Sequence, residues 1–255
     1  MALSDAQVLG WLGHFLWPFL RITGLFLTAP LYGSPLIPAP VKAALAAGLA
    51  AALAFWLPDL PGFPSDGFVA IGDGALQIAY GAMLGMAMQI VVAAAAGAGE
   101  MAGLAMGLSF AELQFRETPG ATPVLYDVLF WVGLLGYMAA GGPLWLFAAL
   151  AHSFAHGIGV AEITDWARLA ALGGTLMSAA VTLALPVLAV SLCVNLTVGL
   201  TTVFAPQLNL LSIGFPLLIL AGLWMLELSV GAAGPVIRTA LNTAMSAIAV
   251  ISGHG

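Results

Sequence analysis

Residues 169–226 read LAALGGTLMSAAVTLALPVLAVSLCVNLTVGLTTVFAPQLNLLSIGFPLLILAGLWML and contain no Asp, Glu, Lys or Arg. A helix needs roughly 20 apolar residues to cross the hydrocarbon core of a bilayer, so this stretch is long enough for two crossings. Two other stretches also lack these residue types, 74–99 and 128–161. Each is long enough for one further membrane crossing. The pattern predicts a membrane protein built from apolar helices.

The composition of the whole chain agrees with this interpretation. Of its 255 residues, 62% are hydrophobic and 6% are charged. Soluble domains carry about 25% charged residues, so this chain has too few to cover a surface that faces water. Its net charge of −6 provides no excess of basic side chains for phosphate groups. We therefore expect no nucleic acid among its partners.

Prolines and charged residues divide the chain into apolar segments, because proline lacks a backbone donor and resists helix. The predicted fold class is all-α, a polytopic membrane-associated protein with about six apolar helical segments and no soluble domain. The expected segments are 8–29, 41–57, 68–98 with a continuation to 108, 124–151 with a break near 141–143, 169–204 and 210–233, with Gly234-Pro235 separating a last helix, 236–251.

Glycines in the third segment mark one face of a helix. Gly99, Gly103 and Gly107 are spaced four apart, which lets a second backbone approach closely. Spacing does not name the partner, so a contact within the chain and a contact in an assembly both stay open. Met101 and Met106 lie in the same stretch, where a flexible methionine fills a core gap or seals around a moving peptide.

Two ionisable residues fall inside apolar segments, Arg21 in the first and Glu227 in the sixth. A charge at membrane depth is costly and normally faces protein or water. Arg21 and Glu227 are therefore candidates for buried ion pairs, with each other or with other groups. A proton relay would need a chain of such groups, which the sequence does not show.

No motif in the sequence indicates catalysis. A P-loop, G-x-S-x-G, H-E-x-x-H and C-x-x-C are all absent. His152 and His156 have the spacing of a zinc-protease pair but lack the glutamate that follows the first histidine. We expect no catalytic residue, no metal and no cofactor.

Four stretches are informative together: RITGLFLTAP (21–30), GEMAGLAMGLSF (99–110), ALPVL (184–188) and APQLNLLSIGFP (205–216). In this order and at this spacing they resemble the FliR family of flagellar export proteins and its injectisome relatives. The resemblance covers nearly the whole chain. The ending IGFP (213–216) looks flagellar rather than injectisome-like.

The resemblance implies a non-enzymatic subunit of the flagellar type III export gate, in the bacterial inner membrane at the flagellar basal body. Members of this family assemble with FliP and FliQ and work with FlhB and FlhA. Their helices fold as hairpins in a spiral assembly around a pore that passes unfolded flagellar proteins. Residues 1–204 would form a FliP-like part and residues 205–255 a FliQ-like hairpin, with partner subunits and membrane lipid covering the apolar surface.

The resemblance also implies that the loop from Ser109 to Leu125 helps to plug the closed pore. Its polar composition suits a wet loop between helices. Family members often carry Asp-Pro here, whereas this chain has Thr118-Pro119-Gly120. The plug positions are Ser109, Phe110, Glu112, Arg116, Glu117, Pro119 and Gly120.

A membrane-embedded enzyme would need acids and histidines that converge near one membrane face, and His152, His156, Glu162 and Asp165 are the only nearby group. Two further functions compete with a flagellar gate subunit. One is an injectisome export-gate subunit, which the IGFP ending disfavours. The other is a stand-alone secondary transporter, which predicts interrupted helices and paired repeats. Gly141-Gly-Pro143 and Gly234-Pro235 are interruptions, but no repeat pairing is visible.

Overall fold

The computed structural model describes residues 5–35, 37–57, 60–64, 66–108, 124–154, 166–204 and 213–251. Within these ranges the regular secondary structure is helical and contains no strand. The predicted all-α fold class is confirmed. The helices are α1 (Asp5–Thr28), α2 (Ala39–Ala54), α3 (Gly67–Ala105), α5 (Val124–Ala139), α6 (Gly142–His152), α7 (Trp166–Phe204) and α8 (Phe215–Ile251).

Glycine and proline explain where the α5 and α6 helices meet. Gly141 has a φ of 72°, a left-handed conformation that glycine adopts without steric cost, and it precedes α6. Pro143 lies in the first turn of α6, where a missing N–H leaves no hydrogen bond unmade. The break that the sequence predicts near residues 141–143 is therefore confirmed.

The expectation that Gly234-Pro235 separates two helices is wrong. Helix α8 continues through Pro235 and is bent by 56° between Phe215–Gly231 and Ala233–Ala249. Proline removes the N–H that would bond the carbonyl four residues earlier, here that of Gly231, so it kinks a helix without having to end it.

The chain divides into two compact units, each assembled from separate stretches of sequence. Unit 1 contains residues 1–90, 141–172 and 243–255, and unit 2 contains residues 91–140 and 173–242. Helix α3 supplies its first part to unit 1 and its last part to unit 2. The division at residues 204 and 205 into FliP-like and FliQ-like parts stays a prediction.

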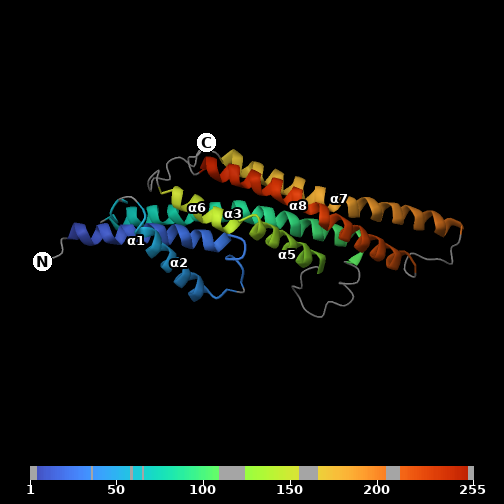
Figure 1. Ribbon diagram of the computed structural model, residues 1–255, viewed down its shortest axis with the longest axis horizontal. Coiled ribbons are helices and arrows are strands. Elements are labelled where there is room, and N and C mark those ends of the chain that lie inside the picture. Colours follow the sequence, from blue (N-terminus) through green and yellow to red (C-terminus); the bar gives the residue numbers. More distant parts are fainter. Residues whose placement is uncertain are drawn as a thin grey trace. The chain divides into compact units, whose positions relative to one another are not determined.

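Unit 1 is held together by a close contact between α1 and the first part of α3, which run side by side in Figure 1. A Cβ on Gly24 would collide with the backbone of Ile78, and a Cβ on Gly81 would collide with the carbonyl of Arg21. Glycine at these positions lets the two backbones touch, and the Thr28 hydroxyl then donates a 2.7 Å hydrogen bond to the Ala82 carbonyl. Helix α2 packs against α1.

Aromatic rings pack at two places in unit 1. At the first place Trp17 Nε1 donates a 3.0 Å hydrogen bond to the Pro61 carbonyl, and the centroid of its ring lies 5.3 Å from that of Phe63. At the second place Tyr32 stacks on Phe26, at 4.7 Å between ring centroids, and meets the edge of Phe147 on α6. Burial raises the pKa of Tyr32. These contacts hold the connection between α2 and α3 against the middle of α1, and the turn after α1 against α6.

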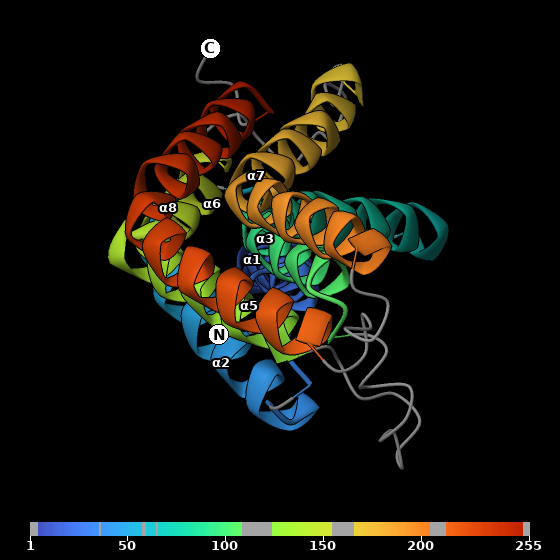
Figure 2. The ribbon, with the colours of Figure 1, turned by 90° about the vertical axis from the view of Figure 1, so that its right-hand side faces the viewer.

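Unit 2 is a bundle of four helices around a core of small and aliphatic side chains. The contacts between them place α5 and α8 beside the last part of α3, as Figure 2 also shows. The small residues let the helices approach closely, and the larger ones fill the remaining space. The buried core residues are Ala98, Ala102, Met106, Leu125, Leu129, Ala184, Val187 and Leu226.

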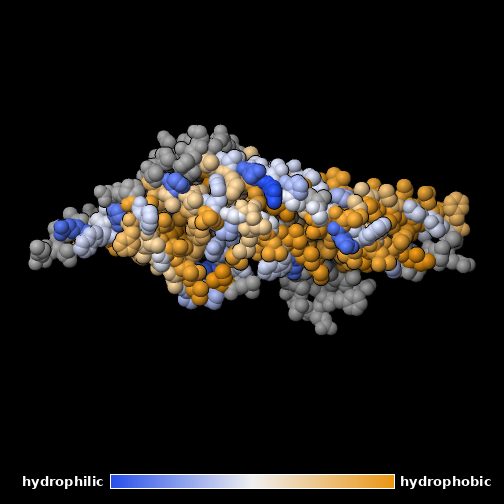
Figure 3. Space-filling view, in the orientation of Figure 1, coloured by the Kyte–Doolittle hydropathy of each residue, from blue (hydrophilic) through white to orange (hydrophobic). Residues whose placement is uncertain are grey.

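Much of the outer surface is apolar, and orange side chains dominate the face drawn in Figure 3. Two helices, Gly67–Ala105 and Ala170–Phe204, are long and apolar enough to cross a membrane, and two bent pairs raise the number to four within the described residues. Hydropathy alone predicts about six. Helix α2 is one reason for the difference, because its 16 residues are fewer than the roughly 20 that a crossing needs.

Candidate functional site

The predicted plug positions lie outside the described residues, which resume at Val124 after Leu108. The candidate site is therefore built from the residues that flank this segment at the end of α3 and the start of α5. All of these belong to unit 2.

Gly99 and Gly103 face the start of α5. A Cβ on Gly99 would collide with the carbonyl of Leu125, and one on Gly103 would lie 3.8 Å from the Leu125 side chain. Leu125 is itself buried in the core of unit 2. The glycine spacing read from the sequence therefore serves a contact within the chain, which fixes the first turn of α5 against α3.

Gly107 ends α3 in a left-handed conformation and lies under an aromatic ring. Its φ is 73°, and a Cβ there would lie 2.6 Å from Cε1 of Phe215, the first residue of α8. Any other residue at position 107 would meet both backbone strain and the Phe215 ring. The end of α3 is thus joined to the beginning of α8.

Met106 reinforces this junction from the core side. Its side chain is fully buried and fills a notch at Gly222, where a Cβ would lie 2.5 Å from Met106 Cγ. Met101 is half-buried and packs on the same core. Of the two roles that the sequence left open for these methionines, the structure shows core filling, and sealing around a peptide stays a prediction.

Arg21 is the buried cation that the sequence singles out, and it lies at the centre of unit 1. Its Nε donates a 2.8 Å hydrogen bond to Gln77 Oε1 on α3, and its Nη1 donates a 2.7 Å hydrogen bond to Ser153 Oγ. Ser153 in turn donates to the Leu150 carbonyl at the end of α6. Three helices therefore converge on one guanidinium.

Two aromatic rings complete the surroundings of Arg21. Its guanidinium carbon lies 4.0 Å from the centroid of the Phe154 ring and 4.6 Å from that of Tyr80. Arginine stays charged in proteins, and aromatic faces attract cations. The contacts that hold this charge are made by neutral groups, an amide, a hydroxyl and two rings.

The other ionisable candidates are exposed. Glu227 lies on the surface of α8 in unit 2, and an ion pair between it and Arg21 of unit 1 stays a prediction. His152 is exposed at the end of α6, and His156 lies outside the described residues. Among the described residues no group of three or more His, Cys, Asp or Glu is arranged to hold a metal.

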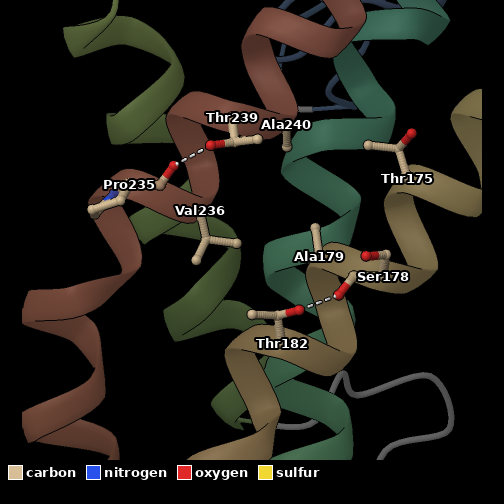
Figure 4. A pocket seen from close by; sticks show the side chains of 8 residues that line it. All are labelled: Thr175, Ser178, Ala179, Thr182, Pro235, Val236, Thr239 and Ala240. Atoms are coloured by element: carbon tan, nitrogen blue, oxygen red, sulfur yellow. Dashed lines mark hydrogen bonds between the residues drawn. The ribbon is translucent and has the colours of Figure 1, made fainter.

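A groove of about 290 Å³ lies between α7 and α8 in unit 2 (Figure 4). Two of its hydroxyls bond to their own helices, Thr182 to the Ser178 carbonyl and Thr239 to the Pro235 carbonyl. The described residues that line this groove have small, apolar or hydroxyl side chains. Its residues are Thr175, Ser178, Ala179, Thr182, Pro235, Val236, Thr239 and Ala240.

Each of the four stretches quoted from the sequence contributes a packing contact. Arg21 to Pro30 forms the α1 side of the contact with α3, and Gly99 to Leu108 faces α5 and α8. Ala184 and Val187 are buried in the core of unit 2, and Phe215 covers Gly107. The residues that carry the resemblance are thus those that fix how the helices pack.

Comparison with known proteins agrees with the resemblance that these four stretches indicate. The family described as bacterial export proteins, family 1, matches residues 12–244. The chain belongs to this family. It is 36% identical over 228 residues to the flagellar biosynthetic protein FliR of Escherichia coli K12, covering 88% of this chain and 86% of that protein.

Two further FliR proteins show the same extent of likeness. That of Pectobacterium carotovorum is 33% identical over 232 residues, covering 89% of this chain and 88% of that protein. That of Aquifex aeolicus is 30% identical over 217 residues, covering 83% of each. The likeness to FliR proteins thus extends over nearly the whole chain, including both units.

Sequence reasoning missed several residues of the two sites. Gln77, Tyr80 and Ser153, which surround Arg21, carry no periodic or motif signal of their own. Gly222, the notch for Met106, lacks a second glycine four residues away. Phe215 stood within the motif that ends in Pro216, and its contact with Gly107 could not be read from the spacing.

Proposed function

We propose that this chain is a non-enzymatic subunit of the flagellar type III protein-export gate in the bacterial inner membrane. It would assemble there with FliP and FliQ, work with FlhB and FlhA, and form part of the pore that passes unfolded flagellar proteins. The observation that carries the proposal is the likeness to FliR proteins along nearly the full length of both chains.

Two features of the structure support a role in an assembly. Large apolar side chains are exposed on both units, among them Trp56 at 89% and Leu192 at 70%. An isolated protein rarely exposes so much apolar surface unless lipid or partner subunits cover it. The candidate sites hold glycines, methionines and one buried arginine, a set that favours close packing over chemistry.

We further propose that residues 109–125 help to close the pore. The support lies on both sides of this segment, since Gly107 is fixed under Phe215 and Leu125 is fixed against Gly99. A polar segment between two such anchors could block the pore or leave it through a modest change in contacts. A difference of a few kcal/mol between closed and open states is sufficient for such a switch.

The test of the assembly is co-purification from detergent-extracted membranes, with and without FliP and FliQ from the same organism. We expect one large complex that contains all three proteins. A stable, uniform particle of this chain alone, unaffected by the other two, would contradict the proposal and favour a stand-alone transporter. The bent α8 is the feature that such a transporter would share.

The plug is tested on the same complex. Deleting residues 113–118 should leave the complex intact and make the reconstituted gate conduct small ions. An intact complex with unchanged conductance would contradict the plug but leave the assembly proposal standing.

A further inference from the structure

A stripe of exposed residues runs along α8 in unit 2. Successive members lie four, three, four, three and four positions apart, which is the spacing of the contact seam between two long helices. The stripe, called here the outer face of α8, consists of Leu220, Trp224, Glu227, Gly231, Gly234 and Arg238.

The first part of the outer face is apolar and uncovered. Leu220 is 68% exposed and Trp224 is 69% exposed. A stripe lining a water-filled pore would not present these two side chains one helical turn apart. Their exposure favours contact with lipid or with another protein.

The two charges decide between lipid and protein. Glu227 and Arg238 are both exposed and lie about three helical turns apart on the same side of α8. A charge is costly within the hydrocarbon core of a bilayer. Opposite charges on a neighbouring helix remove this cost, and lipid tails do not.

Glycines between the two charges allow a helix to lie close. Gly231 and Gly234 have no atom within 4 Å of the position that a Cβ would take, so the space beside them is open. Small residues of this kind let two backbones approach each other in a membrane. Both glycines lie where α8 bends, so the two halves of the outer face meet at residues that have no side chain.

We propose that the outer face of α8 docks one helix of another membrane subunit. That helix would carry a basic side chain opposite Glu227 and an acidic side chain opposite Arg238. Between them it would present small or aliphatic residues to the glycines. This inference rests on the proposed function, since it names the surface that one of the gate's other subunits would cover.

The test uses the complex of the full chain with FliP and FliQ, purified through a tag on this chain. Glu227→Lys and Arg238→Glu should each lower the recovered complex at least tenfold, because like charges facing each other across an interface cost several kcal/mol. Glu100→Lys, which reverses an exposed acid on α3 in the same unit, should not. Thermal unfolding of the purified chain alone should be unchanged in all three variants.

A genetic selection then tests the charge of the partner. Among motile revertants of the Glu227→Lys variant, we expect substitutions that replace a basic residue in a membrane helix of another subunit. Recovery of normal amounts of complex by both charge-reversal variants would overturn the inference and assign the face to lipid. Labelling of Gly234→Cys by a water-soluble maleimide in the assembled complex would overturn it and assign the face to the pore.

The outcomes separate this inference from the proposed function. If the unmodified chain recovers neither FliP nor FliQ, the proposed function fails, and the face loses the partner that its charges require. If the unmodified chain recovers both and the charge-reversal variants do so equally well, only the inference fails.

Discussion

Gly107 and Phe215 are joined so closely that a Cβ on the glycine would lie 2.6 Å from the phenylalanine ring. The contact ties the last turn of α3 to the first turn of α8 across more than a hundred residues of sequence. It combines two demands on one position, a left-handed backbone and the absence of a side chain. Substitutions can separate these two demands.

Gly107→Ala should destabilise the protein more than Gly141→Ala. Both glycines have nearly the same φ, 73° and 72°, so both alanines carry the left-handed strain of about 1–2 kcal/mol. Only the alanine at position 107 also meets a ring, since no atom lies within 4 Å at Gly141, and such overpacking adds about 1–3 kcal/mol. Thermal unfolding in detergent measures both. Equal losses would show that the Phe215 contact contributes nothing, and Phe215→Ala should reduce the loss caused by Gly107→Ala.

Gly81→Ala should loosen unit 1, whereas Gly72→Ala should not. The alanine at position 81 would collide with the Arg21 carbonyl, a backbone atom that cannot rotate away, and we expect a loss of about 3 kcal/mol. The alanine at position 72 of the same helix meets no atom within 4 Å and should stabilise by about 0.5–1 kcal/mol, because alanine favours helix over glycine. Circular dichroism during heating gives the two values. A neutral Gly81→Ala would mean that α1 and α3 are further apart than the structure shows.

Arg21→Lys should destabilise the protein although it keeps the charge. Lysine has a single ammonium on a flexible stem, so it cannot bond Gln77 and Ser153 together while stacking between two rings. We expect a loss of about 2 kcal/mol, as for buried polar groups left without partners. Lys42→Arg on α2 exchanges the same two residue types in the opposite direction, and this control should leave the unfolding midpoint unchanged. Trp17, buried on the same helix, provides a fluorescence signal for unfolding, and an unchanged midpoint would show that charge alone is what unit 1 needs.

Pro235→Ala should straighten α8. The alanine restores the N–H that can bond the Gly231 carbonyl, so the cause of the 56° bend is removed. Spin labels on the exposed residues Leu220 and Asn242 would report the change, since a straight helix puts their backbones about 33 Å apart and the bend shortens this by about 4 Å. An unchanged distance would show that packing around α8, rather than the proline, causes the bend.

Local features of the fold were predictable because they depend on neighbouring residues. The segment expected from residue 41 corresponds to α2, which begins two residues earlier at Ala39 because Pro40 fits the first turn of a helix, and Gly141-Gly-Pro143 indicated the end of α5. The same local reasoning failed at Gly234-Pro235, because packing on both sides of a proline can hold a helix through it. Glycine and proline show where a helix is weakened, and packing against the surrounding helices decides whether it ends there.

Partners across the fold were not predictable in this way. The spacing of Gly99 and Gly103 gives a helix face, but the start of α5 that covers this face has no complementary pattern. Arg21 was recognised as a buried charge, and an acidic partner was the natural expectation. Neutral dipoles and aromatic faces can hold a guanidinium as well, and sequence spacing does not reveal them.

The arrangement around Arg21 constrains the order in which the helices of unit 1 can reach their final packing. Arg21 leaves the ribosome early, yet the serine that accepts its hydrogen bond is 132 residues further along the chain. At typical rates of synthesis this separation lasts on the order of 10 s. During that interval Arg21 has only Gln77 and Tyr80 of its final partners and lacks Ser153 and Phe154. The packing of α1 is therefore completed only after α6 has been made, so the first helix of the chain depends on one that is synthesised much later.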